Sequence, residues 1–196
     1  MHTDALAVLD FWFGPPDDPG HHQPRAMWFT KDDAFDARIA ERFGPLIARA
    51  LVGGIDDWLT RPVDPLPALA QVLVLDQFTR NVFRGSARAF AGDAMALQTA
   101  RALVASGADR ALTSVQRQFA YLPFEHAEDL SHQRTAVQLF QQLAADDPAR
   151  AGLVEWAQKH LDIVARFGRF PHRNAALGRA STDEEAAFLQ TPGSGF

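Results

Sequence analysis

Three stretches of the chain set charged, imidazole and amide side chains within otherwise apolar sequence, and chemistry could occur there. The first, residues 75–85, carries Asp76, Arg80, Asn81 and Arg84. On a helix, residues four apart are neighbours, so Asp76 lies beside Arg80 and Arg80 beside Arg84. Two guanidinium groups next to the Asn81 amide would form a forked anion site. The alternative is an Asp76–Arg80 ion pair that braces two helices, because Arg suits buried ion pairs.

The second stretch, residues 121–129, places Glu125 and His126 just after Pro123. Proline cannot donate a backbone hydrogen bond, so a helix kinked there would release a carbonyl group for a ligand. Because Glu125 and His126 adjoin this break and aromatic residues, the pattern favours a functional role for them. His126 would act as general acid or base, and Glu125 would orient it.

The third stretch, residues 166–174, contains three Arg and one His in a turn between helices, with His160 shortly before it. Gly168 would let the backbone turn sharply or approach a ligand closely. Arg166 could simply cap the preceding helix, whose carbonyl end favours cations. Arg169 and Arg173 are then predicted to bind an anion, and His172 to be a second acid or base.

A metal site is a further hypothesis for the second stretch. A helix continuing from Glu125 would place Glu125, Glu128, Asp129 and His132 on one stripe, which suits a hard divalent metal ion. A di-iron bundle needs two Glu-x-x-His units, however, and this chain has only Asp129-x-x-His132. Glu128 and His132 also fit a solvated helix face. The sequence therefore predicts neither a metal nor a cofactor.

Helical periodicity predicts the elements that must position these stretches. Apolar residues recur every three or four positions through most of the chain. Residues 68–78 are apolar nearly all round, and the polar residues that continue them in four-residue steps favour a helix over a strand. Pro123 should break or kink its helix, Ser181 and Glu184 resemble a capping box, and the four Trp should be core residues. The predicted helices cover residues 3–13, 32–51, 68–78, 92–104, 114–122, 125–145, 148–167 and 181–189.

These elements predict an all-α fold of about eight or nine helices, packed as stacked antiparallel helical hairpins. With 196 residues and 47% hydrophobic residues, the chain should form one domain, residues 1–196. A net charge of -5 argues against nucleic-acid binding, and the absence of cysteine excludes disulfides and thiolate metal sites. No apolar run is long enough to span a bilayer, and the N-terminus has no basic signal-peptide region, so a cytoplasmic location is expected.

The three stretches resemble signature segments of a mainly bacterial family, domain of unknown function 924. Residues 8–14 and 177–185 also resemble that pattern, so the resemblance covers almost the whole chain. It implies a tetratricopeptide-like α–α superhelix but no established activity. Thr79 departs from the proline expected in the family, so the helix there should run on smoothly. Tetratricopeptide consensus spacing is absent, and peptide binding in the usual groove is therefore not implied.

The leading functional hypothesis is a pocket for a small anionic ligand, formed where the three stretches converge. Asp76, Arg80, Asn81, Arg84, Arg169 and Arg173 would bind the ligand, and Glu125, His126 and His172 would supply acid–base catalysis. The alternative is a non-enzymatic helical scaffold that binds a protein partner. The sequence leaves open whether the protein is an enzyme and what its oligomeric state is.

Overall fold

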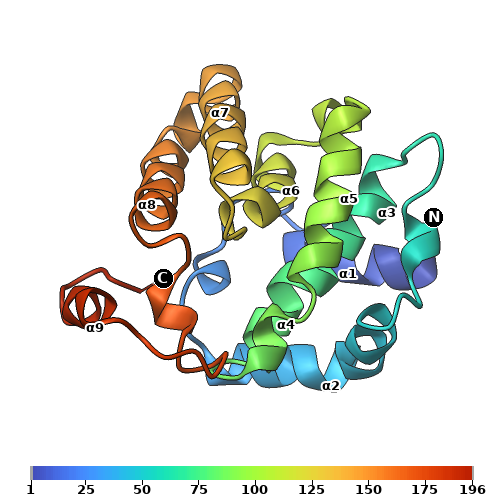
Figure 1. The fold of residues 1–196 in the computed structure, drawn as a ribbon. Coiled ribbons are helices and arrows are strands. Elements are labelled where there is room, and N and C mark those ends of the chain that lie inside the picture. The colour runs from blue at the N-terminus through green and yellow to red at the C-terminus, as the bar shows by residue number, and fades with distance from the viewer. Residues whose placement is uncertain (1, 196) are drawn as a thin grey trace. The chain divides into compact units, whose positions relative to one another are not determined.

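The structure is a computed structural model that describes residues 2–195. Over these residues the chain forms helices and no strand, which confirms the predicted all-α class (Figure 1). Within the same range, no helix is both long enough and apolar enough to cross a membrane. The α-helices are α1 (Thr3–Phe13), α2 (Asp33–Ala50), α3 (Pro65–Val72), α4 (Thr79–Val82), α5 (Asp93–Ala105), α6 (Ser114–Glu125), α7 (Leu130–Asp146), α8 (Gly152–Phe167) and α9 (Asp183–Leu189). Shorter elements are the π-helix η3 (Leu73–Phe78) and the 3-10 helices η1 (Ala26–Trp28), η2 (Asp56–Trp58), η4 (Ala87–Phe90), η5 (Ala108–Ala111), η6 (Pro148–Arg150) and η7 (Pro171–Arg173).

Contacts along the chain divide it into two compact units. Unit 1 comprises the chain up to Arg84 together with Arg88–Pro123, and unit 2 comprises Gly85–Ala87 and the chain from Phe124 onward. The first stretch lies in unit 1 up to Arg84, whereas Glu125, His126 and the third stretch lie in unit 2. That residues 1–196 fold as one domain stays a prediction.

Unit 1 is built around aromatic side chains. Helix α1 packs on α3, α3 packs on α5, and α2 packs on both α4 and η3. At the centre, the buried Trp12 ring lies 5.9 Å from Phe35, 5.6 Å from Phe78 and 5.5 Å from Phe119, measured between ring centroids. Tilted and edge-on ring contacts of this kind stabilise a core beyond the area that they bury.

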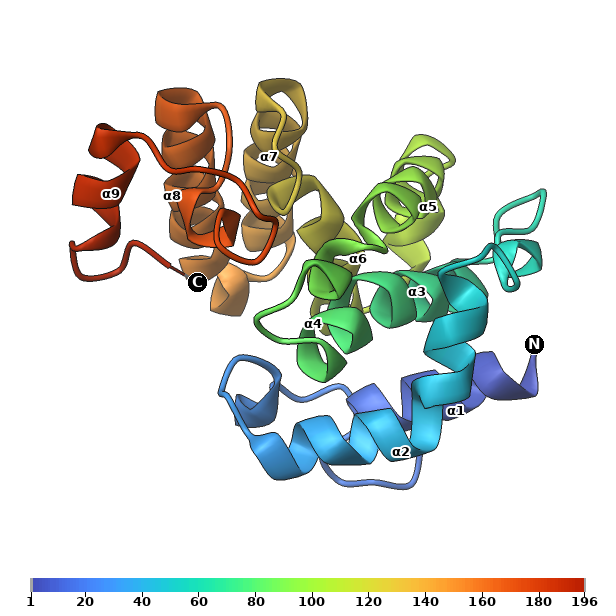
Figure 2. The same cartoon turned by 60° about the horizontal axis from the view of Figure 1, so that its bottom comes forward.

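One feature of unit 1 was not predicted, a π-helical segment in the helix that carries the first stretch. Elements α3, η3 and α4 follow one another directly from Pro65 to Val82, which confirms the predicted helix (Figure 2). The helix also runs on through Thr79, whose hydroxyl donates to the Leu75 carbonyl at 2.8 Å. Short π-helical segments occur often at functional sites. Here it carries Asp76 within the buried interior of unit 1.

The backbone of the π-helix lies so close to the segment before α5 that the residue at position 92 must be glycine. A Cβ atom added at Gly92 would lie 2.1 Å from the Leu75 carbonyl oxygen, which belongs to the backbone and cannot rotate away. A Cβ at Gly152, the first residue of α8, would meet nothing within 4 Å.

We therefore expect Gly92→Ala to lower the free energy of unfolding by about 2 kcal/mol, since the backbone of η3 or the start of α5 must shift to relieve the overlap. Gly152→Ala is the matched control, and it should leave stability unchanged or raise it by up to about 1 kcal/mol. Urea unfolding of both variants measures the difference. Equal stability of the two variants would contradict the close packing at Gly92.

In unit 2, α7 and α8 form a helical hairpin. They are joined through η6 and lie side by side in both views (Figures 1 and 2). This hairpin is the kind of building block that the sequence predicts, while its tetratricopeptide-like stacking stays a prediction. The prediction that all four Trp are core residues is wrong for Trp156, which is 51% exposed on α8 with the Lys159 ammonium 4.5 Å from its ring centroid. Trp12, Trp28 and Trp58 are buried as predicted.

The helix boundaries around the second stretch differ from the prediction. Helix α6 continues two residues past Pro123 instead of ending at Leu122. The next helix does not begin at Glu125 but at Leu130, because the Asp129 carboxylate caps it and accepts from the backbone N–H groups of Ser131 and His132. Glu125 and His132 therefore lie on different helices, and the single stripe on which the metal hypothesis depended does not form.

The last helix, α9, ends at Leu189 as predicted, but its capping box lies one residue later than expected. The pair is Thr182 and Glu185, not Ser181 and Glu184. The Thr182 hydroxyl accepts from the Glu185 backbone N–H at 3.2 Å, and the Glu185 carboxylate accepts from the Thr182 backbone N–H at 2.8 Å. The sequence therefore predicts a capping box at the start of this helix but places it one residue too early.

Candidate functional site

In unit 1, Arg80 bridges two carboxylates on different elements. Asp76 is fully buried on η3, and its carboxylate lies 3.1 Å from Arg80 Nη1. The two terminal nitrogens of Arg80 also donate to the Asp93 carboxylate on α5, at 2.9 and 3.0 Å. Burial lowers the pKa of Arg80, but the charges of Asp76 and Asp93 raise it above its ordinary value. This geometry is that of an ion pair bracing two elements, the alternative that the sequence left open.

The other two predicted ligand-binding residues of unit 1 share one acidic partner. The Asp36 carboxylate on α2 accepts from Asn81 Nδ2 at 2.6 Å, and from Arg84 Nε at 2.5 Å and Nη2 at 3.2 Å. These contacts hold the segment that includes α4 against α2. Both guanidinium groups of the first stretch therefore already bind carboxylates of the chain itself.

The two arginines should differ in their effect on stability. In Arg80→Met the buried Asp76 carboxylate loses a cationic partner, which should cost roughly 3 kcal/mol of the free energy of unfolding. Arg84→Met removes a cation whose side chain is 39% exposed, and should cost less than about 1 kcal/mol. Urea unfolding of the two variants tests this. A small and equal loss in both would show that Arg80 is not needed to neutralise Asp76.

In unit 2, Arg169 likewise binds a carboxylate of the chain. Its Nε and Nη2 donate to the two Glu185 oxygens at 2.6 and 2.8 Å. Hydrogen bonds from Arg169 and then from the Thr182 backbone lower the pKa of Glu185 to about 2. Asn174 Nδ2 donates to the same carboxylate at 3.2 Å. Arg169 thus joins the loop after α8 to α9.

Glu128 makes a second such connection. Its carboxylate accepts from Arg179 at 2.6 and 2.9 Å, and from the Phe170 backbone N–H at 2.7 Å. Burial raises the pKa of Glu128, but the bonds from Arg179 and Phe170 outweigh that effect, so the pKa lies below its ordinary value. Glu128 therefore links the segment between α6 and α7 to the loop after α8.

These links bring parts of the second and third stretches together at a group of side chains that we call the imidazole cluster. Glu125 and His160 are buried, with His160 Nδ1 3.2 Å from Glu125 Oε1. The His126 and His160 ring centroids lie 6.3 Å apart. The cluster consists of Glu125, His126, His160, His172 and Arg173, with the Phe170 ring packed among them, 5.5 Å from His160 and 5.6 Å from His172 between centroids.

Side chains from neighbouring elements fix the backbone at His126. Gln133 on α7 donates both amide hydrogens, to the Glu125 carbonyl at 2.6 Å and the Ala127 carbonyl at 2.7 Å. Arg173 Nη1 donates to the intervening His126 carbonyl at 3.0 Å, and the Arg173 guanidinium lies 4.4 Å from the Phe170 ring centroid. Three successive carbonyls after the proline of α6 are therefore bound by side chains. Gln133 was not among the predicted site residues.

His160 was noted near the third stretch but was not predicted as a site residue. Its Nδ1 lies 2.9 Å from the Trp156 carbonyl oxygen, which can only accept a hydrogen bond. Nδ1 must therefore carry the hydrogen, and the lone pair of the neutral ring lies on Nε2. The Glu125 carboxylate lies 3.2 Å from His160 Nδ1, while the role of Glu125 in orienting His126 stays a prediction.

The environment keeps His160 neutral. Burial lowers the pKa of its imidazole, the bond to the Trp156 carbonyl raises it, and the charges of His126, Arg173 and His172 lower it further. The resulting pKa is about 3. These electrostatic effects also show that the cationic groups of the cluster lie close enough to His160 to act on its charge.

The low pKa of His160 predicts a loss of stability in mild acid. An unfolded histidine titrates near 6.5, so the contribution of His160 is complete above about pH 6.5 and declines as the pH falls from there toward 3. Between pH 7.5 and pH 5 this group should cost about 2 kcal/mol of the free energy of unfolding. Urea unfolding at both pH values should show that the free energy of unfolding falls by about 2 kcal/mol less in His160→Gln than in the wild type.

His2→Gln, at a half-exposed position, is the matched control and should follow the wild type over the same pH range. An unchanged pH dependence in His160→Gln would contradict the neutral state assigned to this imidazole.

The side chains of residues 2–195 are not arranged as a metal site. Within residues 2–195, no group of three or more His, Asp or Glu side chains is placed to hold a metal ion. Asp129 caps α7 and His132 Nδ1 lies 3.1 Å from it, so both serve the start of that helix.

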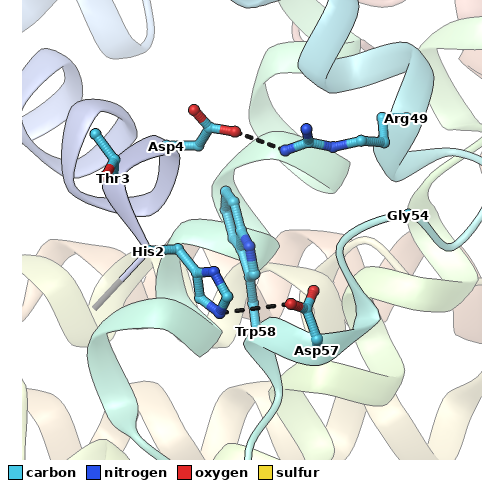
Figure 3. A pocket seen from close by; sticks show the side chains of 7 residues that line it. All are labelled: His2, Thr3, Asp4, Arg49, Gly54, Asp57 and Trp58. Atoms are coloured by element: carbon cyan, nitrogen blue, oxygen red, sulfur yellow. Dashed lines mark hydrogen bonds and ion pairs between the residues drawn. The ribbon is translucent and has the colours of Figure 1, made fainter.

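Unit 1 also contains a polar hollow that the sequence did not point to. It has a volume of about 340 Å³. Figure 3 shows the side chains that line it. Asp4 and Arg49 form an ion pair at 2.6 Å across it, and His2 lies 3.5 Å from Asp57. Its lining residues are His2, Thr3, Asp4, Arg49, Gly54, Asp57 and Trp58. None of the predicted site residues lies among them, and the charged groups of the hollow pair with one another.

The site residues therefore fall into two groups. The residues of the first stretch bind carboxylates within unit 1, whereas Glu125, His126, His172 and Arg173 gather within unit 2. Arg169 lies in unit 2 too, where it pairs with Glu185. Convergence of all three stretches on one pocket stays a prediction.

Comparisons with known proteins agree with this architecture. The model of a family described as "Bacterial protein of unknown function (DUF924)" matches residues 8–193. A solved structure of a protein of unknown function from Agrobacterium tumefaciens has a TM-score of 0.80 and 39% sequence identity, and covers 95% of this chain and 96% of that chain. A search of curated proteins finds no match.

Proposed function

Because the chain belongs to the DUF924 family of bacterial proteins of unknown function, we propose its function from the site itself: the imidazole cluster of unit 2 binds a small anionic ligand. The single observation that carries the proposal is the grouping of His126, His172 and Arg173 near His160, which itself contacts the buried Glu125 carboxylate. Burial is the main cause of the low pKa of His160, and the charges of His126, Arg173 and His172 lower it further because these groups lie near that imidazole.

Arg173 is the guanidinium that contacts the ligand in this proposal. It uses Nη1 to hold the His126 carbonyl and stacks on Phe170, so its planar group is held in one orientation. A fixed guanidinium binds carboxylate or phosphate groups with strong, directional hydrogen bonds. Arg80, Arg84 and Arg169 hold carboxylates of the chain, and their part in the proposal is to fix the elements that carry them.

The histidines add the capacity to move a proton. His126 and His172 are half-buried, and a histidine near neutral pH can both donate and accept a proton. The Glu125 carboxylate lies 3.2 Å from His160 Nδ1 and helps to hold that ring in the cluster. In this proposal His126 or His172 exchanges a proton with the ligand. Whether a bond is then broken depends on the ligand, so the proposal is a binding site equipped for acid–base chemistry.

The same proposal keeps a cytoplasmic location, as expected from the sequence, and excludes nucleic acid as the ligand. The net charge of the chain is -5, which disfavours a polyanion. Binding of a small anion, by contrast, depends on the groups of the cluster that surround it more than on the net charge of the whole chain.

Thermal unfolding against a panel of phosphates, nucleotides and organic acids tests the proposal. A ligand at about 100 times its Kd stabilises the folded state by roughly 2.7 kcal/mol, which should raise the Tm of a chain this size by at least about 5 °C. We expect one class of anion to give this shift in the wild type and not in Arg173→Gln.

Arg134→Gln is the matched control, since Arg134 is exposed on α7 of the same unit and should leave the shift intact. Arg173→Lys keeps the positive charge but loses the forked guanidinium geometry, so it should retain only part of the ligand-induced rise in Tm. If no anion raises the Tm of the wild type, or if Arg173→Gln retains the full shift, the cluster is not an anion site.

A further inference from the structure

The polar hollow of unit 1 is lined by a buried tryptophan whose hydrogen-bond donor is not used by the protein. Trp58 is only 2% exposed, yet no group of residues 2–195 accepts a hydrogen bond from its indole N–H. A tryptophan buried to this extent usually has a partner for that group. Figure 3 shows the indole between the Asp4–Arg49 pair and the His2–Asp57 pair, where it lines the hollow. The N–H is therefore a donor for a molecule that enters the hollow.

The start of helix α1 adds further donors. Thr3 and Asp4, the first two residues of α1, line the hollow, and the N-cap residue His2 makes no side-chain cap. The His2 ring instead lies 6.0 Å from the Trp58 ring, measured between centroids. The first N–H groups of a helix have no partner within the helix and favour an anion. Arg49 lies on the same hollow, and its guanidinium has donors beyond the one that Asp4 accepts.

Two carboxylates on the hollow disfavour a simple anion there. Asp4 is paired with Arg49 at 2.6 Å, whereas Asp57 lies 3.5 Å from His2, which is longer than a normal hydrogen bond. An anion without a positive group would be repelled by both carboxylates. A cation without a negative group would be repelled by Arg49 and by the dipole of α1. A molecule that carries one group of each sign avoids both repulsions.

We propose that the hollow binds a small zwitterion, a free α-amino acid. Its carboxylate lies at Arg49, the Trp58 N–H and the start of α1, and its ammonium lies at Asp57. The volume of about 340 Å³ is near the lower end of the range of small-molecule sites, roughly 300–1,000 Å³. Guanidinium and backbone N–H groups bind a carboxylate with strong, directional hydrogen bonds, and a carboxylate accepts them from an ammonium. None of these residues belongs to the imidazole cluster, so the inference is independent of the function proposed for unit 2.

The ion pair between Asp4 and Arg49 is compatible with a ligand carboxylate. The two side chains are 53% and 50% exposed, and an ion pair with this exposure contributes little to stability. Arg49 can therefore share its guanidinium between Asp4 and the ligand at a small cost. The Asp57 side chain, at 67% exposed, is likewise free to turn toward an ammonium group.

Thermal unfolding of the whole chain against each of the twenty standard amino acids tests the inference, since a ligand of the folded state raises the Tm. The amino acid with the largest effect is then compared, by isothermal titration calorimetry, with two analogues. Its α-hydroxy acid lacks the ammonium, and its methyl ester lacks the carboxylate. We expect the amino acid to bind the wild type at least about 10-fold more tightly than either analogue, because each analogue leaves a charged group of the hollow without its partner.

Two variants assign the two ends of the ligand. Arg49→Gln should weaken binding of the amino acid at least about 10-fold and remove its preference over the methyl ester. Asp57→Asn should weaken binding to a similar extent and remove the preference over the α-hydroxy acid. Both side chains are at least half-exposed, so both variants should fold.

Arg38→Gln on α2 and Asp56→Asn on η2 are the matched controls, because they make the same changes of charge at exposed positions that do not line the hollow. Both should keep the Kd of the wild type within about twofold, since charges in water are screened. If no amino acid raises the Tm, or if the α-hydroxy acid binds as tightly as the amino acid, the hollow is not a zwitterion site. Unchanged binding in Arg49→Gln or in Asp57→Asn would overturn the inference as well.

Discussion

The contact between the Glu125 carboxylate and the His160 imidazole constrains the rest of unit 2, because both groups are buried and neither can be left there without partners. An ionised carboxylate taken out of water needs donors close by, and a buried imidazole is favoured in its neutral form. Nδ1 of His160 serves both the Trp156 carbonyl and Glu125, which fixes the tautomer. Arg173 binds the His126 carbonyl and Gln133 binds the Glu125 carbonyl, so the backbone that carries these side chains is held in place.

Arginine has two different roles in this chain, and its position along the sequence does not distinguish them. Arg80 pairs with Asp93, thirteen residues away, Arg84 with Asp36 and Arg169 with Glu185. Each pair joins different elements, so its partner becomes visible only once the helices are packed. Arg173 donates to the His126 backbone carbonyl, and its guanidinium lies over the Phe170 ring. The same residue type thus braces the fold at three positions and lies within the cluster at the fourth.

Local periodicity was enough to predict the helices, and it failed where tertiary contacts decide the outcome. The spacing of apolar residues predicts the helix over residues 68–78, but it does not predict the π-helical segment within it, where the Leu75 carbonyl closely approaches Gly92. The predicted break between α6 and α7 is misplaced because the metal hypothesis puts Asp129 within a helix, whereas its carboxylate is the N-cap of α7. Likewise, the sequence motifs indicate Glu125 and His126 but not α8, whose His160 lies against Glu125.

His160 is the residue that a stricter reading of the sequence could have selected. It lies three residues after Ala157 and three before Ile163, both buried, so it occupies the apolar stripe of α8. A histidine on such a stripe has to be neutral and hydrogen-bonded, since burial opposes its charge. Packing alone would be served as well by an aliphatic side chain, which would carry no desolvation cost and no dependence on pH. An imidazole at this position, against a buried carboxylate and near His126 and His172, is therefore better explained by the proton chemistry that we propose for the cluster than by the packing of the helical hairpin.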